Sequence, residues 1–231
     1  MNCMNKLKNS GMEVLDTLKN GDTLLVGGFG LIGAPLTLID ALKEKEVKDL
    51  TVVSNNLGES GKGLGLILNQ NKIKKVIGSY FTSNRDVGEK YQKGELTIQL
   101  LPQGTMAEAL RAGGAGIGGF YTKTAVGTKL AEGKEQRVLD DETYIFEQSI
   151  KGDVAFIRAH KADELGNLTY YKTARNFNPL MATAAKYVVA EVDEIVPVGS
   201  LNAEEIVTPH LFVDAIIVAQ KVLTKDGVKS L

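Results

Sequence analysis

A glycine pattern between an apolar run and a helical pattern constrains the fold more than any other feature of this sequence. Residues 23–26 form the apolar run, and Gly28, Gly30 and Gly33 then spell G-x-G-x-x-G. From residue 36 to residue 44, apolar side chains recur along one helical face. The segment therefore predicts a buried strand, a tight turn and a helix, which together form the repeating unit of an α/β sheet.

The rest of the chain alternates between strand and helix patterns. Further strands are expected at residues 50–54, 75–80, 96–100, 143–147, 154–160, 167–171, 186–191 and 213–218. Helices are expected at residues 11–19, 84–93 and 105–111, the last with a Thr105–Glu108 capping box and ended by Gly113-Gly114. The alternation favours an α/β fold with an open, mostly parallel sheet flanked by helices. No linker-like stretch divides the chain, so residues 1–231 are expected to form a single domain.

Net charge and residue composition limit the partners, the metals and the cellular location that are expected for this chain. The formal net charge is −1, so no nucleic-acid partner is expected. No apolar run reaches the length of about 18 residues that a membrane span needs, so no membrane partner is expected. Cys3 is the only cysteine, which excludes an intrachain disulfide and fits a reducing compartment, and the cytoplasm is the expected location. His160 and His210 are isolated and lack metal-ligand spacing, so no metal is expected.

The glycine pattern alone fits a dinucleotide site, because a helix that follows a strand offers free N–H groups to a phosphate. Such a site also needs an acidic residue about 20 positions further on, at the end of the next strand, to hold the ribose. Here the next strand ends in Ser54-Asn55-Asn56, and Asp49 lies before it, at the wrong end. NAD binding stays an alternative, beside a turn without a ligand and a site for a different ligand.

Amide side chains follow two other predicted strands. Asn55 follows the strand at 50–54, and Gln103 follows the strand at 96–100. Open α/β sheets bind ligands outside the carboxyl ends of their strands, so the glycine pattern and both amides are expected to meet at one crevice. Neutral amides and backbone N–H groups suit a carbonyl, a carboxylate or a developing oxyanion. No nucleophile or base is evident beside them, and the chain looks like half of an active site.

Residues 20–29, Asn-Gly-Asp-Thr-Leu-Leu-Val-Gly-Gly-Phe, together with Gly33 and Pro35, resemble the signature of the alpha subunit of family I coenzyme A transferases. The 3-oxoacid type, which exchanges coenzyme A between succinyl-CoA and acetoacetate, is the most similar. The likeness extends through most of the chain, at residues 54–56, 63–65, 94–96, 101–105, 111–116, 120–122, 161–163, 166–167 and 174–178.

That family moves coenzyme A by covalent catalysis, in which a glutamate carboxylate attacks an acyl-CoA and becomes a glutamyl-CoA thioester. The family's glutamate belongs to the beta subunit, in a Ser-Glu-Asn-Gly motif. No Glu-Asn-Gly occurs here, and Glu164 is interpreted as part of a turn between two strands. The resemblance therefore implies no catalytic nucleophile in this chain, a beta-subunit partner in an α2β2 assembly, coenzyme A esters as substrates, and no permanently bound cofactor.

The resemblance also implies site residues. Asn55 and Gln103 would hold acyl or carboxylate oxygens beside the incoming glutamate. The backbone of residues 27–33, here called the glycine loop, would approach the substrate or the pantetheine arm of coenzyme A. The loop residues concerned are Gly27, Gly28, Phe29, Gly30 and Gly33.

For three further residues, the role that the resemblance implies has an alternative. Gly114 and Gly116 would belong to a second loop near the crevice, with a plain surface connection as the alternative. Arg175 would pair with a phosphate of the substrate or coenzyme A, or would form a buried structural salt bridge.

The expected reaction is transfer of coenzyme A from succinyl-CoA to acetoacetate, as in ketone-body metabolism. Acetyl-CoA or butyryl-CoA are alternative donors, because one methylene changes affinity by only about 1–3 kcal/mol. The alternatives from other classes are an NAD-dependent oxidoreductase and a non-catalytic ligand-binding module.

Overall fold

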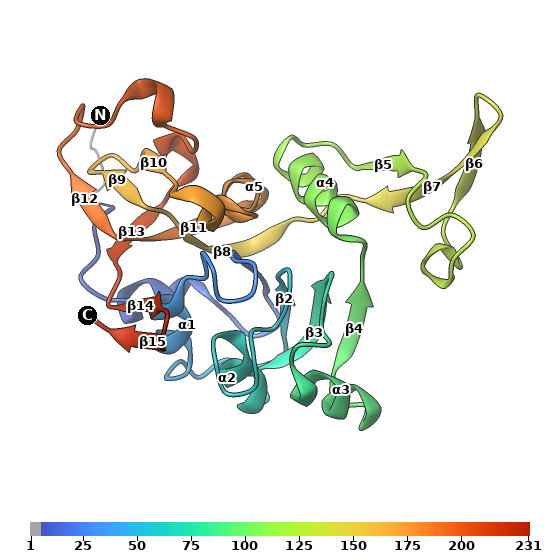
Figure 1. The fold of residues 1–231 in the computed structure, drawn as a ribbon, viewed down its shortest axis with the longest axis horizontal. Coiled ribbons are helices and arrows are strands. Elements are labelled where there is room, and N and C mark those ends of the chain that lie inside the picture. Colours follow the sequence, from blue (N-terminus) through green and yellow to red (C-terminus); the bar gives the residue numbers. More distant parts are fainter. Residues whose placement is uncertain (1–5) are drawn as a thin grey trace.

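A seven-stranded parallel sheet forms the centre of the molecule. The computed structural model describes residues 6–231, and Cys3 lies outside them. The strand order is β13-β11-β8-β1-β2-β3-β4, and neighbouring strands are parallel (Figure 1). The strand bounds are Thr23–Val26 for β1, Leu50–Val53 for β2, Ile73–Gly78 for β3, Thr97–Leu100 for β4, Gly152–Arg158 for β8, Ala185–Val192 for β11 and Ala215–Val218 for β13. The expected open, parallel α/β sheet is confirmed.

Helices cover both faces of this sheet. One core lies under α1, α2 and α3, and the other lies under α4 and α5. Leu24 and Val26 of β1 join the first core, whereas Leu25 joins the second, because successive side chains of a strand point to opposite faces. The helix bounds are Leu36–Leu42 for α1, Leu64–Asn69 for α2, Arg85–Gln92 for α3, Gln103–Gly114 for α4 and Asn178–Ala184 for α5. Burial on both faces explains the continuous apolar run at residues 23–26.

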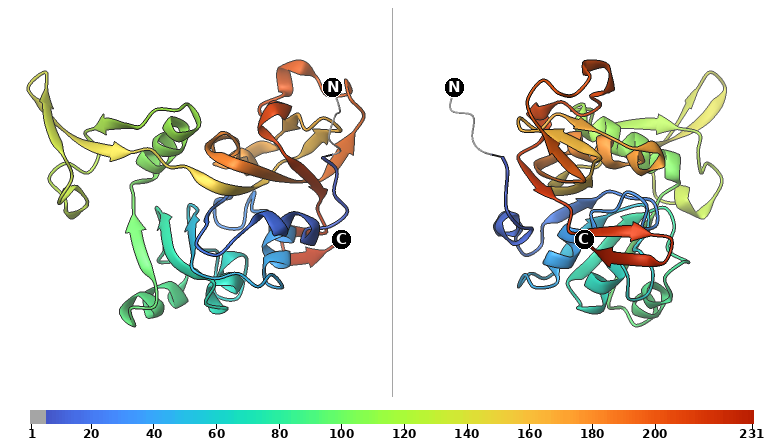
Figure 2. Two further views of the ribbon diagram at one scale, coloured as in Figure 1. Left: turned by 180° about the vertical axis from the view of Figure 1, so that it is seen from behind. Right: turned by 60° about the vertical axis from the view of Figure 1, so that its left-hand side comes forward.

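The described residues also form three small sheets. β9 (Lys161–Asp163) pairs with β10 (Leu168–Thr169) and β12 (Glu194–Val196), and β14 (Lys221–Thr224) pairs with β15 (Gly227–Ser230). The third sheet, of β5 (Gly119–Thr122), β7 (Glu142–Gln148) and β6 (Gln136–Leu139), projects from the body (Figures 1 and 2). We call residues 119–148 the arm. Short 3-10 helices span Met12–Thr17, Lys129–Ala131, Lys172–Arg175, Ala203–Glu205 and His210–Phe212.

The start of α4 differs from the expectation. The helix begins at Gln103, directly after Pro102, so the predicted Thr105–Glu108 capping box is wrong. Thr105 lies inside the first turn, where its hydroxyl is buried and has no hydrogen-bond partner among residues 6–231. The expected end of the helix is confirmed, because α4 stops at Gly114.

Several other elements differ from the sequence-based expectation in kind or place. The helix expected at 11–19 is the 3-10 helix Met12–Thr17, and the strand expected at 143–147 belongs to the arm. The strand expected at 167–171 shrinks to β10, in a small sheet. Glu164 lies in the turn between β9 and β10, as expected, and the Asp163 carboxylate accepts backbone N–H groups of that turn.

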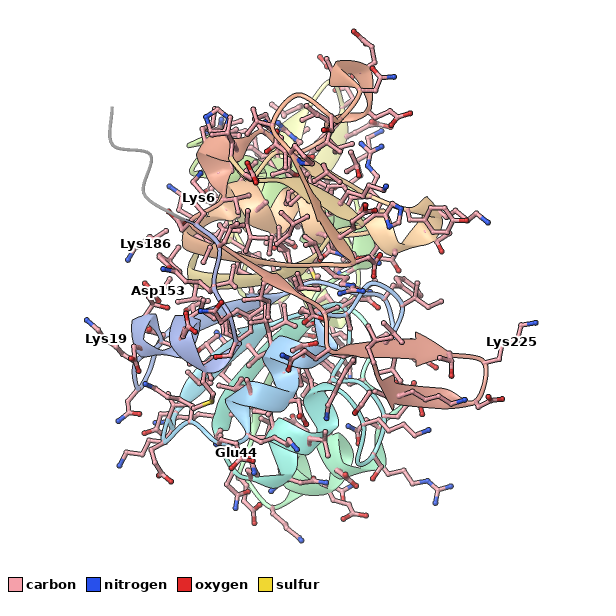
Figure 3. The ribbon with its side chains drawn as sticks, turned by 90° about the vertical axis from the view of Figure 1, so that its left-hand side faces the viewer. Lys6, Lys19, Glu44, Asp153, Lys186 and Lys225 are labelled. Carbon is pink, nitrogen blue, oxygen red and sulfur yellow. The ribbon has the colours of Figure 1, made fainter. Side chains whose placement is uncertain are left out.

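The two edges of the main sheet differ in chemistry. At the amino ends of the strands, Asp153 of β8 accepts the Thr23 N–H at 2.9 Å and pairs with Lys186 of β11 at 2.8 Å (Figure 3). The hydrogen bond from Lys186 lowers the pKa of the Asp153 carboxyl. The carboxyl ends carry the glycine loop and the amides of Asn55 and Gln103, together with an ion pair between Arg158 of β8 and Glu191 of β11. Across the described chain, the helices are too short or too polar to cross a membrane.

Candidate functional site

The glycine loop lies at the carboxyl end of β1. Gly28, Gly30 and Gly33 have φ values of +122°, +64° and +69°, which side chains disfavour, so the backbone itself requires glycine there. The Phe29 N–H donates to the Ile32 carbonyl at 2.9 Å, and the Ile32 N–H donates to the Phe29 carbonyl at 3.2 Å. Both apolar side chains are about half exposed, at 49% and 48%. The loop therefore presents two apolar groups and bare backbone at its tip.

Asn55 follows β2 and is buried. The side-chain Nδ2 donates to the Ser79 hydroxyl at 2.7 Å, and the backbone carbonyl of Asn55 accepts the N–H groups of Ser79 and Tyr80. The amide therefore points to the end of β3, and one of the two hydrogens on Nδ2 is committed to Ser79. The neighbouring Asn56 lies beside the glycine loop, because a Cβ at Gly30 would stand 4.0 Å from Asn56 Nδ2.

Gln103 is exposed at the first position of α4. The chain reaches it from β4, and the Leu101 N–H still donates to the Gly78 carbonyl of β3 at 2.9 Å. Asn55 and Gln103 therefore follow the same edge of the sheet on either side of the end of β3. Their joint action on a substrate stays a prediction.

Glu191 of β11 occupies the amino end of α1. Its Oε2 accepts the N–H of Thr37 at 2.9 Å and of Leu38 at 3.0 Å, and its Oε1 accepts from the Arg158 guanidinium at 3.0 Å. Burial raises the pKa of Glu191 to about 7, against the lowering effect of Arg158 and of the helix N–H groups. These N–H groups, to which a dinucleotide phosphate would bind, are therefore taken by a side chain of the protein itself. This arrangement weakens the NAD alternative.

Arg158 extends this network toward the surface. Its second guanidinium nitrogen contacts one oxygen of Asp193, and the other oxygen lies 2.9 Å from His160 Nδ1. The ring of His160 packs against Tyr171, with 5.2 Å between centroids. Arg158, His160 and Asp193 line a cavity of about 400 Å³ together with residues 31–33 of the glycine loop. Within residues 6–231, no group of three or more His, Cys, Asp and Glu could hold a metal ion.

Sequence reasoning missed Glu191, Arg158, Asn176 and Asn178 as residues that build this edge. The hydrogen bonds from α1 to Glu191 span 154 and 153 positions, and no local spacing reveals contacts over such a separation. A signal for two of them was present in the sequence: Arg158 and Glu191 stand at the ends of apolar strands. Because buried charges are rare unless they are paired, two such residues could have been predicted to pair with each other.

Gly114 and Gly116 lie at the other edge of the sheet. A Cβ at Gly114 would meet the Thr183 hydroxyl at 2.2 Å, so this glycine lets α4 pack against α5. Gly113 packs on the Ile150 carbonyl, just before the amino end of β8. Gly114 thus packs between helices α4 and α5, and a role of Gly114 and Gly116 in the site stays a prediction.

Arg175 is exposed at the end of the 3-10 helix Lys172–Arg175. Among residues 6–231 it is exposed and has no salt-bridge partner, which differs from the buried salt bridge that was one of its two expected roles. Its pairing with a phosphate stays a prediction.

Comparison with known proteins shows which family has a similar sequence. A sequence model described as coenzyme A transferase matches residues 12–219. The alpha (A) subunit of succinyl-CoA:3-ketoacid coenzyme A transferase from Helicobacter pylori strain J99 is 51% identical over 218 residues, which cover 94% of each chain. The alpha subunit of acetate CoA-transferase from Escherichia coli K12 is 45% identical over 203 residues, 88% of this chain and 92% of that one.

A solved structure shares the fold. The acyl-CoA transferase of Escherichia coli O157:H7, in a thioester complex with CoA, superposes with a TM-score of 0.86 at 20% identity. The match covers 100% of this chain and 50% of that protein, so this chain spans about half of its length.

Proposed function

The chain belongs to the coenzyme A transferase family, and from this premise we propose that it is the alpha subunit of a two-chain enzyme that transfers coenzyme A to a 3-oxoacid. The observation that carries the proposal is the 51% identity, over nearly the whole length, to the alpha subunit of a succinyl-CoA:3-ketoacid coenzyme A transferase. The arrangement of amides and bare backbone at one sheet edge supports it, because such donors suit a thioester oxygen that gains charge.

The proposed reaction begins with a glutamate of the beta subunit. Its carboxylate attacks the thioester carbonyl and the C–S bond breaks. The products of this step are an acyl-glutamyl anhydride and the free coenzyme A thiolate. The thiolate then attacks the glutamyl carbonyl and releases the first acid as its carboxylate. The acceptor acid takes up coenzyme A by the same two steps in reverse.

This chain would contribute hydrogen bonds to those steps. The second hydrogen on Asn55 Nδ2, beside the one donated to Ser79, and the amide of Gln103 would donate to the oxygen on which negative charge develops. One such donor in a closed site is worth about 3–4 kcal/mol of the barrier. The hydrogen bond to Ser79 would orient the Asn55 amide before substrate binds.

Succinyl-CoA and acetoacetate are the proposed substrates. A short acyl donor such as acetyl-CoA is the second candidate, and the 45% identity to the alpha subunit of an acetate CoA-transferase favours it. Coenzyme A esters would enter and leave as substrates, with no permanently bound cofactor. We also propose an α2β2 assembly and a cytoplasmic location; the single cysteine in 231 residues supports a reducing compartment.

Reconstitution tests the proposal. The purified chain alone is expected to show no transfer from succinyl-CoA to acetoacetate, and co-expression with its beta subunit is expected to produce that activity. Formation of acetoacetyl-CoA, followed by its absorbance as the magnesium enolate, measures the reaction. Full activity of the chain alone, or none in the two-chain complex with any short acyl-CoA donor, would contradict the proposal.

A further inference from the structure

The Asn176 side chain joins both ends of the glycine loop. Its Oδ1 accepts the Gly28 N–H at 3.1 Å, and its Nδ2 donates to the Ile32 carbonyl at 3.0 Å. The same amide accepts the Phe177 N–H at 2.7 Å and donates to the Thr173 carbonyl at 3.2 Å, so its orientation is fixed by its own segment. One side chain thereby sets the separation between the start and the end of the loop tip.

Asn178 fixes the base of the same loop. This wholly buried side chain donates from Nδ2 to the Gly33 carbonyl at 3.0 Å and to the Ala174 carbonyl at 2.9 Å. Its Oδ1 accepts the Arg158 N–H at 2.8 Å, which ties the loop to the carboxyl end of β8. The glycine loop is therefore attached to the rigid sheet through an amide that comes from α5.

The glycines and the asparagines fit one another. A Cβ at Gly27 would lie 1.8 Å from Asn178 Oδ1, and a Cβ at Gly33 would lie 2.6 Å from Asn176 Nδ2. Asn176 itself has a φ of +22°, a conformation that costs free energy and persists only where its surroundings hold it. The glycine loop and the segment that carries Asn176 and Asn178 are therefore closely fitted to each other.

We propose that Asn176 and Asn178 are positioning residues for the transfer reaction, which hold the glycine loop in the shape that receives the acyl-CoA. The inference rests on the proposed function, since it assumes that the loop contacts the substrate. Without the asparagine amides the loop samples other shapes, and only a fraction of molecules is ready to bind. The apparent affinity falls by that fraction, whereas the chemistry of the bound complex is kept.

The test uses the two-chain enzyme with Asn176→Gly. Glycine accepts the φ of Asn176, so this variant removes the amide without adding backbone strain. KM for the acyl-CoA is expected to rise at least about tenfold, with kcat within about threefold of wild type, because two loop hydrogen bonds are lost. Asn178→Ala is expected to change KM in the same direction.

A matched control comes from Asn167, whose amide also bridges distant segments but lies outside the loop. Its Nδ2 donates to Asp163 at 2.7 Å, and its Oδ1 accepts the His210 N–H at 2.9 Å. Asn167→Ala is expected to leave KM and kcat within twofold of wild type. A similar rise in KM for Asn167→Ala would overturn the proposal, since general loosening would then explain the effect.

Hydrogen exchange on the chain alone provides a readout that needs no activity. The Gly28 N–H is expected to exchange at least about tenfold faster in Asn176→Gly than in wild type, because its acceptor is gone. Unchanged exchange, or unchanged KM in both asparagine variants, would overturn the inference. Gln103→Ala, measured in parallel, separates the two proposals: a fall in kcat of about 100-fold for this variant supports the function even where the asparagine variants behave as wild type.

Discussion

Glu191 is a fully buried carboxylate at the amino end of α1, and two opposing effects act on its proton. The Arg158 guanidinium and the positive end of the helix favour the ionised form. Loss of hydration favours the neutral form and is the larger effect, so the pKa rises from 4.5 to about 7. The attachment of α1 to β11 therefore depends on pH within the physiological range.

The free energy of unfolding is expected to carry a contribution from Glu191 that declines as pH rises from 5 to 8. The unfolded chain releases this proton near pH 4.5 and the folded chain near pH 7, so between these values the folded state binds more protons. The contribution is complete below pH 4.5 and is lost as pH rises through 7. Urea unfolding of the chain alone measures this change. Between pH 5 and 8, the free energy of unfolding of wild type is expected to fall by about 3 kcal/mol relative to that of Glu191→Gln, whose side chain does not titrate.

Asp153→Asn is the control for this comparison. The pKa of Asp153 is lowered, so its carboxyl is ionised in both folded and unfolded states between pH 6 and 8. The difference in unfolding free energy between this variant and wild type is expected to stay constant over that range. If the Glu191→Gln difference were equally constant, Glu191 would be ionised throughout and its raised pKa would be wrong.

Among the helices, α4 contains a local mismatch that a single substitution can remove. The buried Thr105 hydroxyl lacks a partner within residues 6–231, and an unpaired buried hydroxyl costs about 1–3 kcal/mol. Thr105→Val keeps the branched shape, and urea unfolding is expected to give a free energy of unfolding about 1 kcal/mol higher for the chain alone.

Thr37→Val is the matched control for that substitution, because the Thr37 hydroxyl accepts the N–H groups of Gln220 at 2.9 Å and Lys221 at 3.1 Å. Its removal is expected to lower the free energy of unfolding. Destabilisation by both valine variants would mean that the Thr105 hydroxyl has a partner in solution.

The sequence predicts an element well where several independent sequence patterns indicate the same structure. In the unit from β1 to α1, an apolar run, glycines at positive φ and a helical period all indicate the same structure. By contrast, α2 covers only Leu64–Asn69 and follows Gly58, Gly61 and Gly63, so six helical residues are too few to establish a period beside so many turn signals. The predicted capping box at Thr105 was wrong because α4 already begins at Gln103, two residues earlier.

At the scale of the whole molecule, the candidate site was predictable only in part. Asn55, Gln103 and the glycine loop follow predicted strands, and parallel strands end at one edge, so their common location follows from local patterns. Glu191, Arg158, Asn176 and Asn178 reach that edge from much later in the chain. Their contacts depend on the strand order, which puts β8 and β11 beside β1, and no local pattern encodes that order.

The arm projects from the body of the molecule (Figure 1). Its sheet has only three strands, and Val138 and Leu139 are 67% and 40% exposed. The aromatic pair of Tyr121 and Phe146, with centroids 5.3 Å apart, packs within the arm itself. A small sheet with so little buried apolar surface is only marginally stable.

The arm is therefore expected to open separately from the main sheet in the chain alone. Amides of β5, β6 and β7 are expected to exchange at least about 30-fold faster than those of β1 and β8, because their opening costs about 2 kcal/mol less. Hydrogen exchange with peptide-level mass spectrometry measures both regions in one sample, so β1 and β8 are the internal reference. Equal protection in the arm and in β1 would mean that the molecule unfolds as one cooperative unit, with the arm held by α4 as firmly as the strands of the sheet hold each other.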